Sequence, residues 1–378
     1  MTLSTTVLIA SLGMLSVPAL AAYGTAFEND GFVADDWQLV CDNTLTCRAA
    51  GYSAESERSA SILMTLKAGA TTATTQVLLN DEAEENTITP SKGVKHYAEL
   101  WLNDKFYGKA ERAIDESGIS TLSASQTMQL IQHARKNTKI EFRVGDDTWQ
   151  VSDTGMTAVL LKLDEVQGRV GSPLALVSQN HASRHSLKQR QKKPIIHKAF
   201  AYSEADNKQL DAKKQAYFEA HINSWVDIDA EQFIGSSDSM GECDLINPNS
   251  ETSIIYSKYA SDDLHWTFTP IDSRHTLASH PCWTGAYNMG SGYWVIDNNR
   301  PNKPKLITTS GSGYSAGEIF VAHKSRGLGD CWWGQEWVWD GKTFAKAGER
   351  STGMCRGFAG GAWDLPTYVS EVIDIKTQ

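Results

Sequence analysis

The sequence predicts an α+β fold in two parts: an N-terminal α+β unit, followed by a mainly antiparallel β domain that is braced by disulfides. Three observations support this prediction. Strand-like alternating runs and two amphipathic helical stretches fill the first half. Short β-branched or aromatic runs separated by Gly, Asn and Asp fill most of the second half. The six cysteines are grouped in three pairs that are close in sequence.

A length of 378 residues favours two domains rather than one. The boundary is marked by a change in composition, because residues 178–200 are rich in Lys, Arg and His, have no acidic residue and show little apolar periodicity. Such a stretch is typical of a solvated linker, although a basic patch that contacts a polyanion is an alternative. We therefore expect a signal peptide at 1–22, an N-terminal domain at 23–177, a linker at 178–202 and a second domain at 203–378.

In the N-terminal unit, alternation predicts strands at 37–40, 61–66, 75–79 and 99–110, the last broken by a turn at Asn103 and Asp104. A capping box at Ser123 and Gln126 predicts a helix up to about Asn137. Runs at 140–144 and 148–151 predict a hairpin. A second helix is expected from about residue 154, capped by Asp153 and ending before residue 168.

In the second half, Ser203 is expected to cap a helix that ends near Ile222. Only strands are expected after it, at 253–256, 264–268, 293–296, 306–308, 319–322, 337–339 and 343–345.

The first 22 residues carry no charge and end in small residues after an apolar run, which predicts a secretory signal. No later stretch is long and apolar enough to predict an integral membrane segment after signal removal. The net charge of −10 disfavours nucleic acid as a partner. In an exported chain, an even number of cysteines predicts disulfides, and we expect the pairs Cys41–Cys47, Cys243–Cys282 and Cys331–Cys355.

The segment from 330 to 363 contains five tryptophans and is the best candidate for a ligand site. Indole rings either fill a core or provide flat surfaces that stack on a sugar or a peptide, and both interpretations remain open here. The candidate binding residues are those of this segment and its charged neighbours, namely Trp332, Trp333, Trp337, Trp339, Glu336, Asp330 and Arg356.

Other motifs predict chemistry less well. A Gly-x-Ser-x-Gly pattern spans Gly313 to Gly317, but no strand-then-helix context surrounds it. Alternate carboxylates at Asp227, Asp229 and Glu231 lack the glycine of an EF-hand loop, so a solvated acidic turn is favoured over a calcium site. We expect no metal and no cofactor.

Three stretches resemble a known family. They read DWQLVCDNT at 36–44 with CRAAGY at 47–52, GSGYWVID at 290–297, and GDCW, GMCRG and WDLP between 329 and 366. The chain resembles the domain-of-unknown-function family 1176, exported proteins of Gram-negative bacteria, over nearly its whole mature length. The resemblance implies a periplasmic address and no particular activity. The N-terminal unit is also similar to the invasion-associated locus B family, through Trp37-x-x-x-Cys41 and a helix ending in Gln-Gly-Arg, which implies an interaction module.

We therefore expect a non-catalytic periplasmic binding or envelope-associated protein with an aromatic groove for glycan or peptide. The alternative is a hydrolase of an envelope polymer that uses Asp330 with Glu336 or Glu349, because glycosidases combine two carboxylates with aromatic platforms. Salt-bridged structural charges are the competing interpretation of these carboxylates. Whether such an acid pair lines the groove would discriminate binding from hydrolysis.

Overall fold

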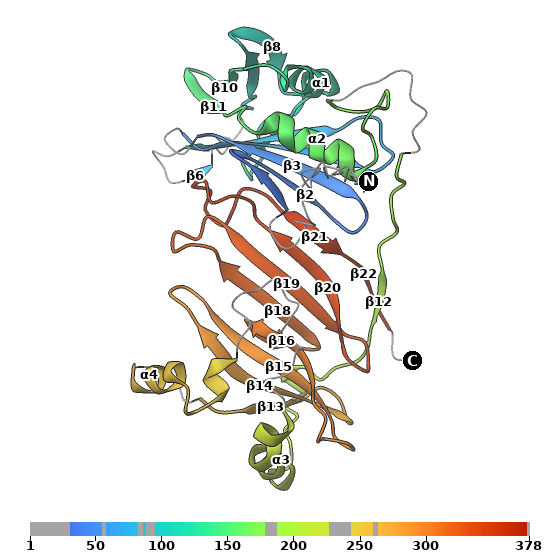
Figure 1. Ribbon diagram of the computed structural model, residues 1–378, viewed down its shortest axis with the longest axis vertical. Coiled ribbons are helices and arrows are strands. Elements are labelled where there is room, and N and C mark those ends of the chain that lie inside the picture. Colours follow the sequence, from blue (N-terminus) through green and yellow to red (C-terminus); the bar gives the residue numbers. More distant parts are fainter. Residues whose placement is uncertain are drawn as a thin grey trace, which may run out of the picture.

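The computed structural model describes residues 31–54, 58–81, 86–87, 95–177, 187–226, 243–259 and 264–375. The expected signal peptide, the first part of the expected linker (178–186) and the acidic motif at Asp227, Asp229 and Glu231 lie outside the described residues. Figure 1 shows two stacked parts, with the N-terminal strands above and the C-terminal strands below.

The N-terminal part is built on an antiparallel sheet with the order β1-β2-β3-β4-β5-β6, with β9 also pairing with β5. A second antiparallel sheet has the order β11-β10-β7-β8. The strands of the two sheets are β1 (Phe32–Ala34), β2 (Trp37–Cys41), β3 (Thr46–Tyr52), β4 (Ala60–Lys67), β5 (Thr74–Asp81), β6 (Asn86–Thr87), β7 (Glu99–Leu102), β8 (Lys105–Lys109), β9 (Ile119–Thr121), β10 (Ile140–Val144) and β11 (Asp147–Val151).

Two helices accompany these sheets, α1 (Ala124–His133) and α2 (Met156–Val166). The capping box predicted for α1 is present, with Ser123 and Gln126 bonding to each other's backbone N–H. The cap predicted for α2 is wrong: Gly155, at φ 93°, is the N-cap, and the Asp153 carboxylate accepts instead from the N–H of Thr138. The apolar face of α2 packs with Trp37 and Trp149 in one buried core.

The C-terminal part contains two antiparallel sheets, with the orders β13-β14-β15-β16 and β17-β18-β19-β20-β21. One buried cluster, which includes Trp337 and Trp339, draws residues from both sheets. Only Ser312 separates β16 from β17, so one long chain segment passes from the first sheet to the second. The strands are β13 (Thr267–Pro270), β14 (His275–Thr284), β15 (Met289–Asp297), β16 (Lys305–Gly311), β17 (Gly313–Ser315), β18 (Glu318–Lys324), β19 (Trp332–Trp339), β20 (Phe344–Ser351) and β21 (Leu365–Val369).

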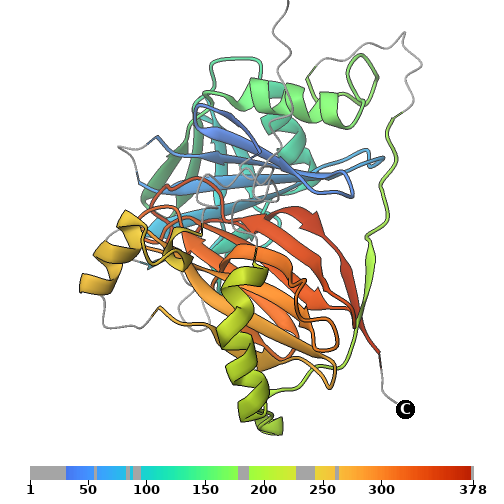
Figure 2. The same cartoon turned by 60° about the horizontal axis from the view of Figure 1, so that its bottom comes forward.

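Helices flank the β13–β16 sheet, as Figure 2 shows. α3 (Ala212–Trp225) begins at Asp211, whose carboxylate accepts from the N–H of Lys214. Phe218 and Ile222 of α3 pack with the sheet residues Trp294 and Ile296. The helix predicted to begin at Ser203 begins only after Asp211. Ser203 caps instead the 3-10 turn η1 (Glu204–Asp206).

The expectation of strands alone after α3 is wrong at 253–256. Residues Glu251–Tyr259 form the helix α4, and the 3-10 turn η3 (Asp244–Ile246) precedes it. The β-branched residues of this short stretch favoured a strand in isolation. In the fold, the Ser250 hydroxyl accepts from the N–H of Ser253, which caps the first turn of a helix.

The two parts share a core. The segment between β20 and β21 packs Phe358 and Trp363 against Val40, Tyr52 and other residues of the N-terminal sheet. Polar contacts join the same surfaces, including an ion pair of Arg356 with Asp36 at 2.8 Å and a hydrogen bond from Trp363 Nε1 to Ser61 Oγ at 2.7 Å. The N-terminal sheet is thus covered on this face by the C-terminal half of the chain.

The described part of the expected linker is ordered by pairing. Residues 195–198 form β12 (Ile195–Lys198), which pairs in parallel with β22 (Glu371–Asp374). Both figures show the two strands side by side at the edge of the molecule. Before β12, the N–H of Gln191 donates to the carbonyl of Thr44, in the turn between β2 and β3 of the N-terminal sheet.

All three expected disulfides are present, joining Cys41 to Cys47, Cys243 to Cys282 and Cys331 to Cys355. Cys331 and Cys355 lie at the start of β19 and in the segment after β20. The last bridge therefore fixes the loop that covers the N-terminal sheet.

Candidate functional site

Two of the tryptophans predicted to form a groove are core residues. Trp339 is fully buried and Trp337 is 9% exposed, and both pack between the C-terminal sheets. A buried ring cannot stack on a sugar or a peptide. The expected groove of four tryptophans is therefore reduced to Trp332 and Trp333.

These two remaining rings are half-buried and engaged with protein. Trp332 donates its Nε1–H to the carbonyl of Gly329, and the Lys324 ammonium lies 5.4 Å from its ring centre. Trp333 packs against His323, with ring centres 6.0 Å apart. Neither ring lines the pocket described next.

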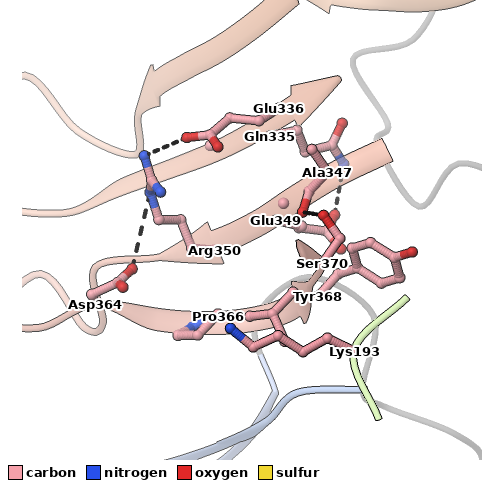
Figure 3. A pocket seen from close by; sticks show the side chains of 13 residues that line it. Lys193, Gln335, Glu336, Ala347, Glu349, Arg350, Asp364, Pro366, Tyr368 and Ser370 are labelled. Carbon is pink, nitrogen blue, oxygen red and sulfur yellow. Dashed lines mark hydrogen bonds and ion pairs between the residues drawn. The ribbon is translucent and has the colours of Figure 1, made fainter. Parts of the chain in front are cut away.

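A polar pocket lies over β19, β20 and β21, with a cavity volume of about 170 Å³ (Figure 3). The three strands present charged and amide side chains to it, and Tyr368 contributes an aromatic ring. The lining side chains used below are Lys193, Gln335, Glu336, Glu349, Arg350, Asp364 and Tyr368.

Arg350 lies between two acidic groups at one end of this pocket (Figure 3). Its Nη2 is 2.8 Å from Glu336 Oε1, and its Nε is 4.0 Å from Asp364 Oδ1. The three side chains are 53%, 48% and 71% exposed, so their pairing contributes little to stability. Charges that stabilise the fold so weakly remain available to a ligand.

Glu349 lies at the other end and is held by three donors. Its carboxylate accepts hydrogen bonds from Gln335 Nε2 at 2.6 Å, Lys346 Nζ at 2.8 Å and Thr367 Oγ1 at 2.9 Å. Burial raises the pKa of this carboxyl, but the bonds from Lys346 and Gln335 outweigh burial and leave the pKa below its ordinary value. Glu349 is therefore a fixed anion at neutral pH.

The remaining wall of the pocket comes from the linker. Lys193 is exposed and directly precedes Pro194, whose carbonyl accepts from the N–H of Glu371. Two residues earlier, Gln191 is bonded to Thr44. The segment that carries Lys193 is thus tied to both parts of the molecule.

The structure separates the other two predicted site residues from the pocket. Asp330 accepts hydrogen bonds from both Nε and Nη2 of Arg326, and its Oδ2 also accepts from the N–H of Gly357 at 2.7 Å. Arg356 pairs with Asp36. Both residues hold the segment after β20 in place, so of the predicted charged residues only Glu336 and the alternative Glu349 line the pocket.

Sequence reasoning missed Lys193, Arg350, Asp364 and Tyr368. None of them belongs to a motif with a chemical meaning, and Lys193 lies in a stretch that composition assigns to a linker. Only the strand pairing of β19, β20 and β21 and the path of the linker bring them together.

The Gly-x-Ser-x-Gly pattern lies in a tight hairpin. Ser315 pairs with Glu318, and the two turn residues Ala316 and Gly317 have φ values of 43° and 81°. A nucleophile elbow needs a strand followed by a helix, whereas β18 follows here. Ser315 is therefore a turn residue.

Among the described residues, the group Asp330, Cys331 and Cys355 has metal-ligating residue types close together. Both cysteines are joined in a disulfide, so their sulfurs are not available as thiolates. In the part of the chain that the structure describes, no helix has the length and apolar character needed to cross a membrane.

A family model described as "Protein of unknown function (DUF1176)" matches residues 31–370. Neither the curated proteins nor the solved structures contain a significant match to the chain.

Proposed function

The chain belongs to the DUF1176 family, and since that description assigns no activity, we propose a function from the pocket: a non-catalytic binding protein of the cell envelope. Its ligand is a small polar unit of a glycan or a peptide. The binding residues are Arg350, Glu336 and Asp364 at one end and Tyr368 beside Glu349 at the other. This replaces the expected aromatic groove by a charged pocket with a single aromatic ring.

The observation that carries the proposal is the exposed charge triplet of Arg350, Glu336 and Asp364. A ligand that bears hydroxyl, ammonium or carboxylate groups can exchange hydrogen bonds with both signs of charge. The cavity of about 170 Å³ is smaller than the roughly 300 Å³ or more of pockets that hold drug-sized molecules. One sugar ring or one amino-acid residue of a polymer matches such a space.

Binding is favoured over hydrolysis by the state of the carboxylates. A glycosidase needs one carboxylic acid whose pKa is raised so that it protonates the leaving group. Glu349 has a lowered pKa, and its carboxylate is already occupied by three donors. Asp330, the other proposed partner, does not line the pocket.

A periplasmic location fits the same proposal. Three disulfides in one chain are typical of proteins that fold in an oxidising compartment. The apolar, uncharged first 22 residues supply the expected export signal.

The test is calorimetric titration of the oxidised protein against a panel of muropeptides and short oligosaccharides. We expect Arg350→Ala to abolish binding of the ligand that the wild type selects. Arg274→Ala is the matched control, because Arg274 is 54% exposed, pairs with Asp297 at 3.0 Å and does not line the pocket. Equal losses in both variants, or no binding by the wild type, would refute the pocket as the site. Turnover of a panel member, lost in Glu336→Gln, would establish the hydrolase instead.

A further inference from the structure

Four polar side chains come together in the C-terminal part, and none of them lines the polar pocket. His323 and Ser351 are each 5% exposed, Trp283 is 7% exposed, and Trp333 is half-buried. Their polar atoms, namely His323 Nε2, Ser351 Oγ and the Nε1 atoms of both indoles, are buried and have no hydrogen-bond partner among the described residues. Such groups are rare in folded proteins, and a bound water molecule or ion is one explanation for them.

The strand register places these side chains together. His323 of β18 lies directly opposite Trp333 of β19, and Trp333 lies opposite Ser351 of β20. Trp283, at the end of β14, meets His323 edge to face, with ring centres 5.0 Å apart. His323 is therefore the common neighbour of both indole rings, whose ring centres lie 5.0 and 6.0 Å from its own.

The four groups have a specific hydrogen-bonding character. Each indole N–H only donates, an unprotonated imidazole nitrogen accepts, and a serine hydroxyl can do both. Burial lowers the pKa of His323, so its ring is neutral at pH 7 and has one bare nitrogen. A single water molecule accepts two hydrogen bonds and donates two, so two donors and two acceptors complete its tetrahedral coordination.

We propose that Trp283, His323, Trp333 and Ser351 hold one long-lived internal water molecule at the junction of the two C-terminal sheets. The water accepts from both indoles and donates to His323 Nε2 and Ser351 Oγ. An ammonium ion cannot occupy this site, because it has no lone pair to accept from the indole N–H groups. A halide cannot do so either, because it has no proton to donate to the imidazole nitrogen. The site is thus selective for a small neutral molecule, and it is independent of the proposed ligand pocket.

The experiment is heteronuclear NMR on the full oxidised protein with ¹⁵N-labelled tryptophan and histidine. We expect the indole N–H protons of Trp283 and Trp333 to show cross-relaxation with water of the sign that marks a long residence time. Trp149 is the matched control, because its indole is 1% exposed and donates to the carbonyl of Asn80 at 2.9 Å. Its N–H should show no such contact.

A second readout is the tautomer of His323. The proposed bonding requires a proton on Nδ1 and a bare Nε2, which long-range ¹H–¹⁵N couplings distinguish. His323→Phe should keep the aromatic packing and remove one acceptor, so the indole protons of Trp283 and Trp333 should exchange about tenfold faster. The Trp149 proton should be unchanged in this variant.

Three results would overturn the proposal. One is a proton on His323 Nε2 that points at the Trp283 ring, since a weak N–H to ring contact would then replace the water. Another is the absence of long-lived water at both indoles. The third is a dependence of the indole shifts on chloride concentration, which would identify an anion as the occupant.

Discussion

The side-chain amide of Asn43 forms two hydrogen bonds with the backbone of Val369. Asn43 Nδ2 donates to the Val369 carbonyl at 3.1 Å, and the Val369 N–H donates to Asn43 Oδ1 at 2.8 Å. One amide thus takes the place of a neighbouring strand at the edge of β21. It also joins the turn between β2 and β3 to the last strand of the five-stranded sheet.

This relationship predicts a stability effect that side-chain size alone would not. Asn43→Ala removes both partners of Val369 and should lower the free energy of unfolding by about 1–3 kcal/mol. Asn43→Asp should be at least as damaging, because a carboxylate cannot donate to the Val369 carbonyl. Urea unfolding measures both variants. Asn249→Ala, at an exposed position after η3, is the control and should change the free energy by less than about 0.5 kcal/mol.

The tryptophans of β19 should differ sharply in their effect on stability. Trp339 is fully buried beside Phe344, with ring centres 5.3 Å apart, so Trp339→Ala should cost about 3–5 kcal/mol. Trp332 is half-buried, and Trp332→Phe removes one hydrogen bond to Gly329, which should cost about 1 kcal/mol. Thermal melts compare the two. Similar losses would contradict the assignment of Trp339 to the core.

Asp330 should make the molecule sensitive to acid. The Arg326 guanidinium lowers the pKa of this carboxyl, and the N–H of Gly357 adds to the effect in spite of burial. Because the folded pKa lies below the unfolded value of about 3.9, the stabilisation is complete above that pH and is lost as the pH falls through the folded value. Asp330→Asn should therefore be less stable at pH 7 and should flatten the stability profile below about pH 4. Equal acid sensitivity in both proteins would exclude Asp330 as its source.

The pairing of β12 with β22 should protect the linker from proteases. A chain that stops at Ser370 lacks β22, so trypsin should cut after Lys192 and Lys198 several-fold faster than in the full chain. A chain that stops at Ile375 keeps the strand and is the control. Mass spectrometry identifies the cuts. Protection that is the same in both truncated chains would show that contacts other than β22 hold the linker.

Local signals in the sequence predict the local structure well. The capping box at Ser123 and the turn at Asn103 and Asp104, whose φ values are 50° and 61°, form as expected, because their determinants lie within a few residues. The short range of the cysteine pairs likewise predicts all three disulfides.

The pocket could not be predicted in the same way. Lys193 and Arg350 are far apart in sequence, and only the path of the chain brings them to one cavity. Tryptophan density directed attention to the segment from 330 to 363, but density does not distinguish a buried ring such as Trp339 from a half-buried one such as Trp332. The expected linker at 178–202 rests on composition alone. Composition does not reveal the pairing of Ile196 with Val372 or the core that Tyr52 and Trp363 share.

The parallel pairing of β12 with β22 also fixes an order of events as the chain emerges, N-terminus first. Ile195 to Lys198 emerge long before Glu371 to Asp374, so the first strand must wait for its partner. Until then the backbone of β12 lacks its ladder, whereas Ile196 packs on Val338 of β19 and Ala347 of β20. The hydrogen bonds of the β12–β22 ladder form only when β22 is present. An incomplete chain therefore leaves the edge of β12 that faces β22 unpaired, where quality-control proteases can recognise it, and a finished chain pairs that edge.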